Sequence, residues 1–187
     1  MHYLHKILVY VPSAIEISNN TSSEDILEAV KSYARSVTEC FEERVYGWRE
    51  ELSAGGWAKQ YPQQAYLASE NLEWFISELD EVLRFQEGEV ASSLIRLGEE
   101  VGTELTSIVQ GLWTSDDRDP FTNPNSKYSR RTAYYFLKMA EMLYGSYRCD
   151  SYFYNTHENT ARLFNSDLNK IKAHPEHWAL VMFDYCS

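Results

Sequence analysis

One apolar stripe at helical spacing constrains the fold of this chain more than any other feature. Between Leu72 and Leu112, apolar residues recur every three or four positions and keep their phase across Gly88. A lone glycine costs a helix only about 1 kcal/mol, and a hairpin would need a longer polar connection. We therefore favour one continuous helix after an N-cap at Ser69, while two helices that break near Gly88 satisfy the same pattern. The stripe consists of Leu72, Phe75, Ile76, Leu79, Leu83, Val90, Leu94, Leu97, Val101, Leu105, Ile108 and Leu112.

Two apolar runs mark predicted strands near the two ends of the chain. Residues 4–11 are rich in β-branched and aromatic side chains and stop at Pro12, and residues 178–185 (WALVMFDY) form a closing strand. A shorter segment, 150–155, is also predicted to be a strand. We expect a small sheet in which the N- and C-terminal strands lie side by side.

Three further helices are predicted. The first follows the capping residues 21–23 and continues to Leu52, because apolar residues recur from Ile26 at alternating spacings of three and four. The other two are expected at about 128–146 and about 160–172.

The composition is that of one folded domain. Hydrophobic residues make up 44% and aromatic residues 14% of the chain, which is more than disordered chains contain. Dividing 187 residues would leave two marginal cores. We expect an α+β fold, a helix-rich single domain that spans residues 1–187.

The net charge of −11 is concentrated in the segment that carries the stripe. Residues 70–112 contain ten acidic and two basic residues, whereas residues 113–187 contain nine of each. A chain this acidic is repelled by a polyanion, so direct binding to nucleic acid is disfavoured. Basic and aromatic residues interleave at the start of the helix predicted at about 128–146. This pattern could bind single-stranded nucleic acid, but the exposed first turn of a helix explains it more simply. These residues are Lys127, Tyr128, Arg130, Arg131, Tyr134 and Tyr135.

Six glutamates are candidates for partner binding, because a helical wheel places them roughly opposite the apolar stripe. Like charges three or four positions apart repel by a few tenths of a kcal/mol, and a helix that needed only solubility would intersperse lysines. The face is therefore either the solvated surface of an acidic protein or a surface that meets a basic partner. The six are Glu70, Glu78, Glu81, Glu89, Glu99 and Glu100.

Motifs that specify a reaction are missing from the sequence. It contains no G-x-S-x-G, no G-x-G-x-x-G and no P-loop. His174 and His177 flank a proline, which argues against one helical face presenting both, so a turn into the last strand is the simpler interpretation. His157 begins an H-E-x-x-H pattern, but position 161 is alanine. We expect no catalytic residue, no metal site and no cofactor.

The cysteines and the length of the apolar runs indicate a cytoplasmic protein. Cys40, Cys149 and Cys186 are odd in number and far apart, so neither a disulfide framework nor a zinc site is suggested. The first apolar run, residues 7–11, is too short for a signal-peptide core. No apolar stretch approaches the roughly 18 residues of a membrane span.

Two stretches at the ends of the chain carry a family resemblance. They are the opening MHYLHKILVYVPSAIEIS and the later YRCDSYFYNTHENTARLF with HWALVMFDYC. Both resemble uncharacterised proteins that conjugative elements and phages of Gram-positive gut bacteria encode. The resemblance implies a mobile-element context, in which small acidic proteins often inhibit CRISPR nucleases or restriction enzymes, some by imitating DNA.

The leading hypothesis is a non-enzymatic inhibitor or adaptor that binds a basic nucleic-acid-binding protein. An anti-CRISPR protein against an RNA-guided DNA nuclease is the best-motivated instance, because such nucleases hold nucleic acid in positively charged channels. One alternative is an uncatalogued enzyme that uses the predicted long loop at 113–127, and another is an accessory protein of conjugation or replication. No membrane partner is expected, and the oligomeric state is left open.

Overall fold

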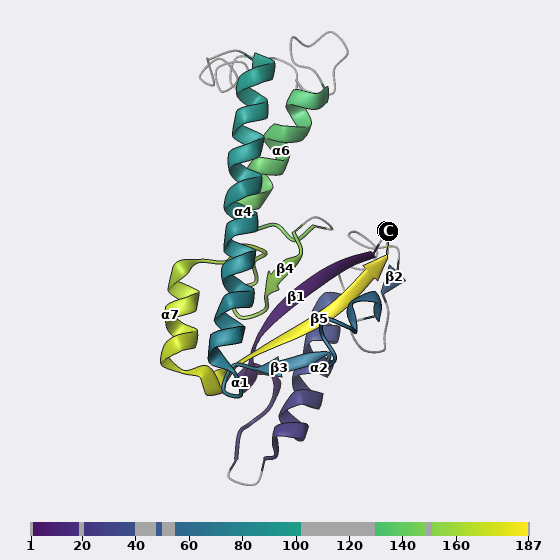
Figure 1. Ribbon diagram of the computed structural model, residues 1–187, viewed down its shortest axis with the longest axis vertical. Coiled ribbons are helices and arrows are strands. Elements are labelled where there is room, and N and C mark those ends of the chain that lie inside the picture. Colours follow the sequence, from purple (N-terminus) through teal and green to yellow (C-terminus); the bar gives the residue numbers. More distant parts are fainter. Residues whose placement is uncertain are drawn as a thin grey trace. The chain divides into compact units, whose positions relative to one another are not determined.

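The computed structural model describes residues 2–18, 21–39, 48–49, 55–101, 130–148 and 151–186 (Figure 1). The chain divides into two compact units, one formed by Met1–Arg84 with Gly145–Ser187 and the other by Phe85–Tyr144. This division does not test whether residues 1–187 unfold as one domain, so that expectation stays a prediction. The predicted α+β class and the helix-rich character are confirmed.

Five strands of the described residues form one mixed sheet in the first unit. Strand β1 (His2–Tyr10) pairs antiparallel with β5 (Trp178–Cys186) over nine registered pairs, from His2 opposite Cys186 to Tyr10 opposite Trp178. The predicted adjacency of the N- and C-terminal strands is therefore confirmed. The short strand β4 (Phe153–Asn155) runs parallel to β1 on its other edge. Strands β2 (Trp48–Arg49) and β3 (Ala65–Leu67) pair antiparallel with the free edge of β5.

Helices cover both faces of this sheet, which explains why β5 and the second half of β1, Ile7–Tyr10, are almost continuously apolar. One face packs on α2 (Ser23–Glu39), and the other packs on the first turns of α4 (Leu72–Val101) and on α7 (Asn165–Ala173) (Figure 1). Successive strand residues point to opposite faces. The cluster on the α2 side includes Ile7, Val9, Val181, Phe183, Val30 and Ala34. The cluster on the α4 side includes Leu8, Leu180, Met182, Phe75, Leu79 and Ile171.

Helix α2 is shorter than its apolar spacing predicts. Its start is confirmed, because the Ser22 hydroxyl accepts a hydrogen bond from Asp25 N–H and the Asp25 carboxylate accepts one from Ser22 N–H, both at 3.1 Å. The predicted continuation to Leu52 is wrong at Trp48 and Arg49, which form strand β2 against β5. Pairing with an exposed sheet edge overrides helical periodicity there.

Helix α4 is continuous through Gly88, so the preferred interpretation of the stripe is confirmed as far as Val101. The remainder of the stripe, 102–112, lies outside the described residues. The predicted cap at Ser69 is wrong. The side chain of Asn71 accepts the hydrogen bond of Trp74 N–H at 3.1 Å, and the helix begins at Leu72.

The remaining elements are short, except for one helix in the second unit. Helix α6 (Arg130–Tyr144) confirms the prediction at 128–146, and α7 confirms that at 160–172 with a later start. Helix α1 (Val11–Ala14) follows β1, and the 3-10 turns η1 (Gly55–Trp57) and η2 (Pro175–His177) precede β3 and β5. Among the described helices, none combines the length and the apolar composition needed to cross a bilayer.

Candidate functional site on helix α4

The structure separates the six predicted glutamates into different environments. Glu70 is exposed but lies in the turn before α4, not on the helix. Glu81 and Glu99 are exposed on α4, as the helical wheel predicts. The side chain of Glu100 lies outside the described residues.

Glu89 is half-buried in the second unit and is already paired. Its carboxylate accepts a hydrogen bond from the Lys138 ammonium group, so α4 and α6 are joined there by an ion pair. The exposed fractions of the two side chains are 31% and 14%. A carboxylate committed to such a pair contributes little free negative charge to an outside partner.

Glu78 departs furthest from its predicted place, because it is buried against the sheet. Its Oε2 atom lies 2.6 Å from Lys6 Nζ of β1 and accepts a hydrogen bond of 2.8 Å from the Tyr61 hydroxyl. Lys6 Nζ also lies 3.5 Å from the exposed carboxylate of Glu81. The position of Glu78 on a predicted outward face is therefore wrong. Its charge is balanced by a lysine inside the strand, which a helical wheel of α4 alone does not reveal.

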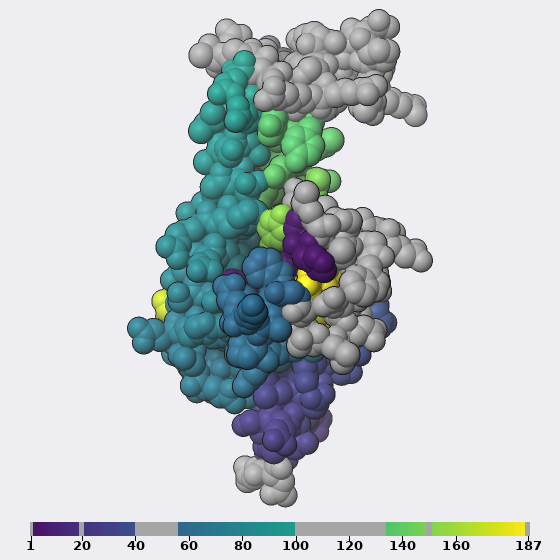
Figure 2. Space-filling view, turned by 45° about the vertical axis from the view of Figure 1, so that its right-hand side comes forward, coloured from purple at the N-terminus to yellow at the C-terminus, as the bar shows by residue number. Residues whose placement is uncertain are grey.

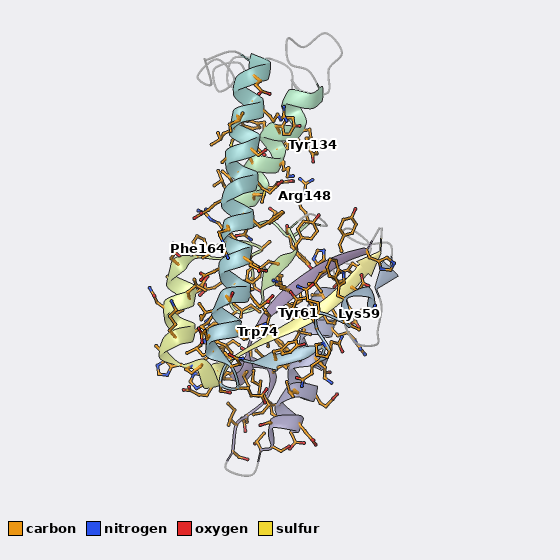
Figure 3. The ribbon with its side chains drawn as sticks, viewed as in Figure 1. Lys59, Tyr61, Trp74, Tyr134, Arg148 and Phe164 are labelled. Carbon is orange, nitrogen blue, oxygen red and sulfur yellow. The ribbon has the colours of Figure 1, made fainter. Side chains whose placement is uncertain are left out.

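Burial of Tyr61 has an electrostatic consequence. Desolvation first, and then the hydrogen bond to the Glu78 carboxylate, raise the pKa of Tyr61 above its ordinary value of 10.0. The neutral hydroxyl therefore remains a donor to Glu78 throughout the neutral and mildly alkaline range. The ring of Tyr61 also contacts the ring of Trp74, with centroids 6.4 Å apart (Figure 3). Tyr66 completes this aromatic group, and its ring lies 4.6 Å from that of Trp74 between centroids.

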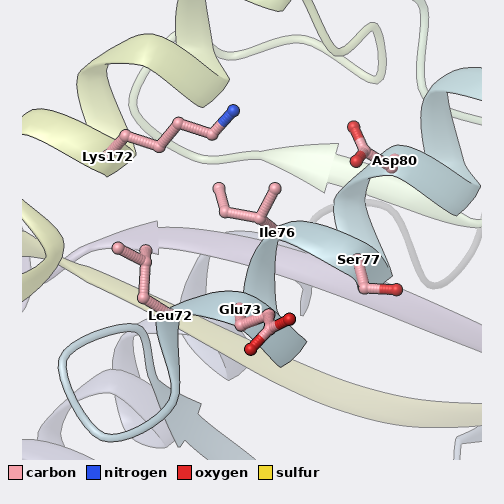
Figure 4. Close-up of a pocket in the computed structure, with 6 residues that line it drawn as sticks. All are labelled: Leu72, Glu73, Ile76, Ser77, Asp80 and Lys172. Atoms are coloured by element: carbon pink, nitrogen blue, oxygen red, sulfur yellow. The ribbon is translucent and has the colours of Figure 1, made fainter.

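An open groove runs beside the first turns of α4, with Lys172 of α7 on its opposite side (Figure 4). Its volume is about 600 Å³. Leu72 and Ile76 provide its apolar lining, and Glu73 and Asp80 supply two carboxylates. These positions, with Ser77 between them, recur at helical spacing along one side of α4. We call this feature the α4–α7 groove.

The α4 side of the α4–α7 groove suits a long cationic side chain, whereas Lys172 on the α7 side carries a charge of the same sign as such a side chain. The stem of an arginine or lysine packs on apolar surface while its head reaches polar groups, and an arginine head pairs with carboxylates in two directions. Glu73 and Asp80 are both exposed, as is Glu70 in the turn before the helix. On the face drawn in Figure 2, the surface of α4 is open to solvent. Composition and spacing predicted that α4 is acidic. Periodicity could not predict that α7 lies beside it and forms the other side of a groove.

A second cluster could hold a metal ion. The ligand atoms of His174, Glu176 and His177 lie within 4.8 Å of one another on and beside turn η2. The predicted turn into the last strand is confirmed. The argument that Pro175 prevents one helical face from presenting both histidines is wrong, because Pro175 begins a 3-10 turn and the two rings stack with centroids 5.4 Å apart. A 3-10 turn brings positions three apart onto one side.

Two other predicted features lie wholly or partly outside the described residues. The 113–127 segment is outside them, as are Lys127, Tyr128 and the side chains of Arg130 and Arg131 in the basic and aromatic group. Within α6, the rings of Tyr134 and Tyr135 contact each other edge to face at 5.2 Å.

Comparisons with protein-family models, with curated proteins and with solved structures found no match for this chain.

Proposed function

We propose that this protein is a non-enzymatic inhibitor or adaptor that binds the basic nucleic-acid-binding surface of another protein in the cytoplasm. The partner that we propose is an RNA-guided DNA nuclease, which would make the protein an anti-CRISPR protein of a mobile element. The observation that carries the proposal is the α4 side of the α4–α7 groove, where apolar residues and exposed carboxylates lie together and face Lys172 of α7.

The chemistry of such nucleases supports this choice. Their nucleic-acid channels are positively charged, so arginine and lysine side chains line them. The groove offers such side chains both partners that they need, because Leu72 and Ile76 can pack on the stem and Glu73 and Asp80 can pair with the charged head. The uneven charge of the chain, with a net −8 between residues 70 and 112, steers a basic surface toward α4 before contact is made.

The residues that we propose for partner binding are not the six glutamates predicted from the sequence. Glu70, Glu73 and Asp80 are exposed beside or in the groove, whereas Glu78 and Glu89 are engaged by Lys6 and Lys138. We therefore assign the contact to the carboxylates of the groove and its approach. Glu81 does not line the groove, and its carboxylate lies 3.5 Å from Lys6 Nζ.

A DNA-cleavage assay tests the proposal. A guide-loaded nuclease from a Gram-positive host is mixed with increasing amounts of the protein, at low and at moderate salt. We expect dose-dependent loss of cleavage that weakens as salt rises, because exposed charges are screened beyond a Debye length of about 8 Å at physiological ionic strength. Cleavage that persists at saturating protein, together with no retention of the nuclease on the immobilised protein, would contradict both the partner and the binding role.

A further inference from the structure

Turn η2 gathers three metal-binding side chains at the entrance to β5. His174 precedes the turn, and Glu176 and His177 lie within it. The side chains are 65%, 54% and 33% exposed, respectively. In the described part of the chain, the ion-pair partners of the Glu176 carboxylate are these two histidines. The carboxylate is therefore not taken up by a lysine or arginine there.

The distances between the ligand atoms of this cluster are close to those in a zinc site. Glu176 Oε1 lies 3.3 Å from His174 Nδ1 and 3.8 Å from His177 Nε2. Tetrahedral zinc has bonds of roughly 2.0–2.1 Å to nitrogen and oxygen, which place neighbouring ligand atoms about 3.4 Å apart. The remaining nitrogen–nitrogen separation is at most 4.8 Å, and rotation of the exposed His174 side chain can shorten it.

The backbone around the cluster is held at both ends. His177 N–H donates to His174 C=O at 3.1 Å, and Trp178 N–H donates to the carbonyl of Pro175. The ring of His177 stands edge-on to Tyr10 at 5.7 Å, and Tyr10 packs on Trp178 at 5.1 Å. These contacts hold the turn against β1 and β5. The three side chains are therefore already close together, which lowers the entropic cost of binding an ion.

We propose that His174 Nδ1, a carboxylate oxygen of Glu176 and His177 Nε2 bind a divalent transition-metal ion, with Zn²⁺ as the ion that this set fits. Imidazole nitrogen favours zinc and its neighbours, whereas calcium and magnesium prefer sets made of oxygen alone. Three protein ligands leave one tetrahedral position for water, which is the open arrangement of zinc sites that are not purely structural. This site is independent of the α4–α7 groove and of the proposed partner.

Calorimetric titration with ZnCl₂ tests the site. The full chain is used without a histidine tag and with its accessible thiols alkylated, so that the three cysteines do not compete. We expect one equivalent of Zn²⁺ to bind and the melting temperature to rise on binding. His174→Ala and His177→Ala should each weaken binding by at least about tenfold, since changes even outside the ligand set cost 10–100-fold. Glu176→Gln should weaken it too. Titration with Co²⁺ adds a visible spectrum that reports the geometry.

The matched control is His2→Ala. His2 also contacts a carboxylate, with Nδ1 3.0 Å from Asp184 Oδ2, but it lies outside the cluster. We expect the His2→Ala protein to bind Zn²⁺ as the wild type does, and circular dichroism should show that all variants remain folded. The proposal is overturned if the wild type binds less than one equivalent, if the His174→Ala/His177→Ala double variant binds as tightly as the wild type, or if His2→Ala abolishes binding.

Discussion

Lys6 of β1 and Glu78 of α4 form an ion pair of 2.6 Å, and their side chains are only 10% and 11% exposed. The pair joins the central sheet to the helix that carries the proposed binding groove. Glu78 also accepts a hydrogen bond from the Tyr61 hydroxyl. Its carboxylate therefore pairs with a cation and accepts a hydrogen bond within one buried network. On the same helix, Phe75 and Leu79 pack into the core, whereas Glu73 and Asp80 are exposed.

Removing one member of this pair should destabilise the fold strongly. We expect Lys6→Met to cost about 3–5 kcal/mol of unfolding free energy, because it leaves the buried Glu78 carboxylate without a cation. Glu78→Leu should cost less, because the Lys6 ammonium group keeps the Glu81 carboxylate at 3.5 Å. The double variant should be more stable than either single variant. Urea denaturation of all three measures this, with Glu73→Ala as an exposed control that should stay within about 0.5 kcal/mol of the wild type. Additive losses in the double variant would show that the two charges do not depend on each other.

The same pair shows where prediction from the sequence reaches its limit. Periodicity correctly predicted α4 and its continuity as far as Val101. The two apolar runs correctly predicted adjacent terminal strands, because strands covered on both faces are mostly apolar. Glu78 was misplaced because its partner is in a strand 72 positions away. A wheel drawn for one helix contains no information on a lysine that enters from elsewhere.

Short elements were missed for a related reason. Strand β3 is formed by three residues, Ala65–Leu67, and β2 by two, so neither leaves a periodic signal. Both exist because the edge of β5 supplies backbone hydrogen-bond partners. The α4–α7 groove was equally invisible, since it requires Lys172 to lie opposite residues that are about a hundred positions earlier in the chain.

Tyr61 should make the stability depend on alkaline pH. Its pKa in the folded chain is raised above 10.0 by burial and by Glu78, so its contribution is fully present below pH 10 and is lost as pH rises toward the folded value. We expect the unfolding free energy to fall by about 1 kcal/mol more between pH 10 and 11 than in a Tyr61→Phe variant. Parallel pH profiles for the two proteins would contradict this assignment.

Asp184 should hold turn η1 against β5. Its buried carboxylate accepts a hydrogen bond of 2.8 Å from Gly56 N–H and lies 3.0 Å from His2 Nδ1. We expect Asp184→Ala to cost about 1–3 kcal/mol, since it removes the acceptor of a backbone donor, and Asp184→Asn to cost less. His2→Ala should cost under about 1 kcal/mol because His2 is half exposed. Thermal denaturation ranks the three variants, and a His2→Ala loss as large as that of Asp184→Ala would refute the account.

Two glycines should respond to alanine in opposite ways. Gly145 has a φ of +84°, and a Cβ there would overlap the side chain of Thr160, so Gly145→Ala should destabilise the protein by several kcal/mol. Gly88 lies inside α4 with open space around its α-carbon. Gly88→Ala should therefore stabilise the helix by about 0.5–1 kcal/mol. Chemical denaturation of both variants checks the pair of expectations, and a destabilising Gly88→Ala would contradict the continuous helix.

The central claim is that the carboxylates of the α4–α7 groove bind a basic partner. Its most direct test compares the affinity of the guide-loaded nuclease for wild type, for Glu73→Lys/Asp80→Lys and for Glu16→Lys/Glu39→Lys, at two salt concentrations. The third protein carries the same change in net charge at exposed sites away from the groove. We predict that the groove variant loses at least about tenfold in affinity, or 1.4 kcal/mol, while the control stays near the wild type. Equal affinity of the groove variant and the control would contradict the claim.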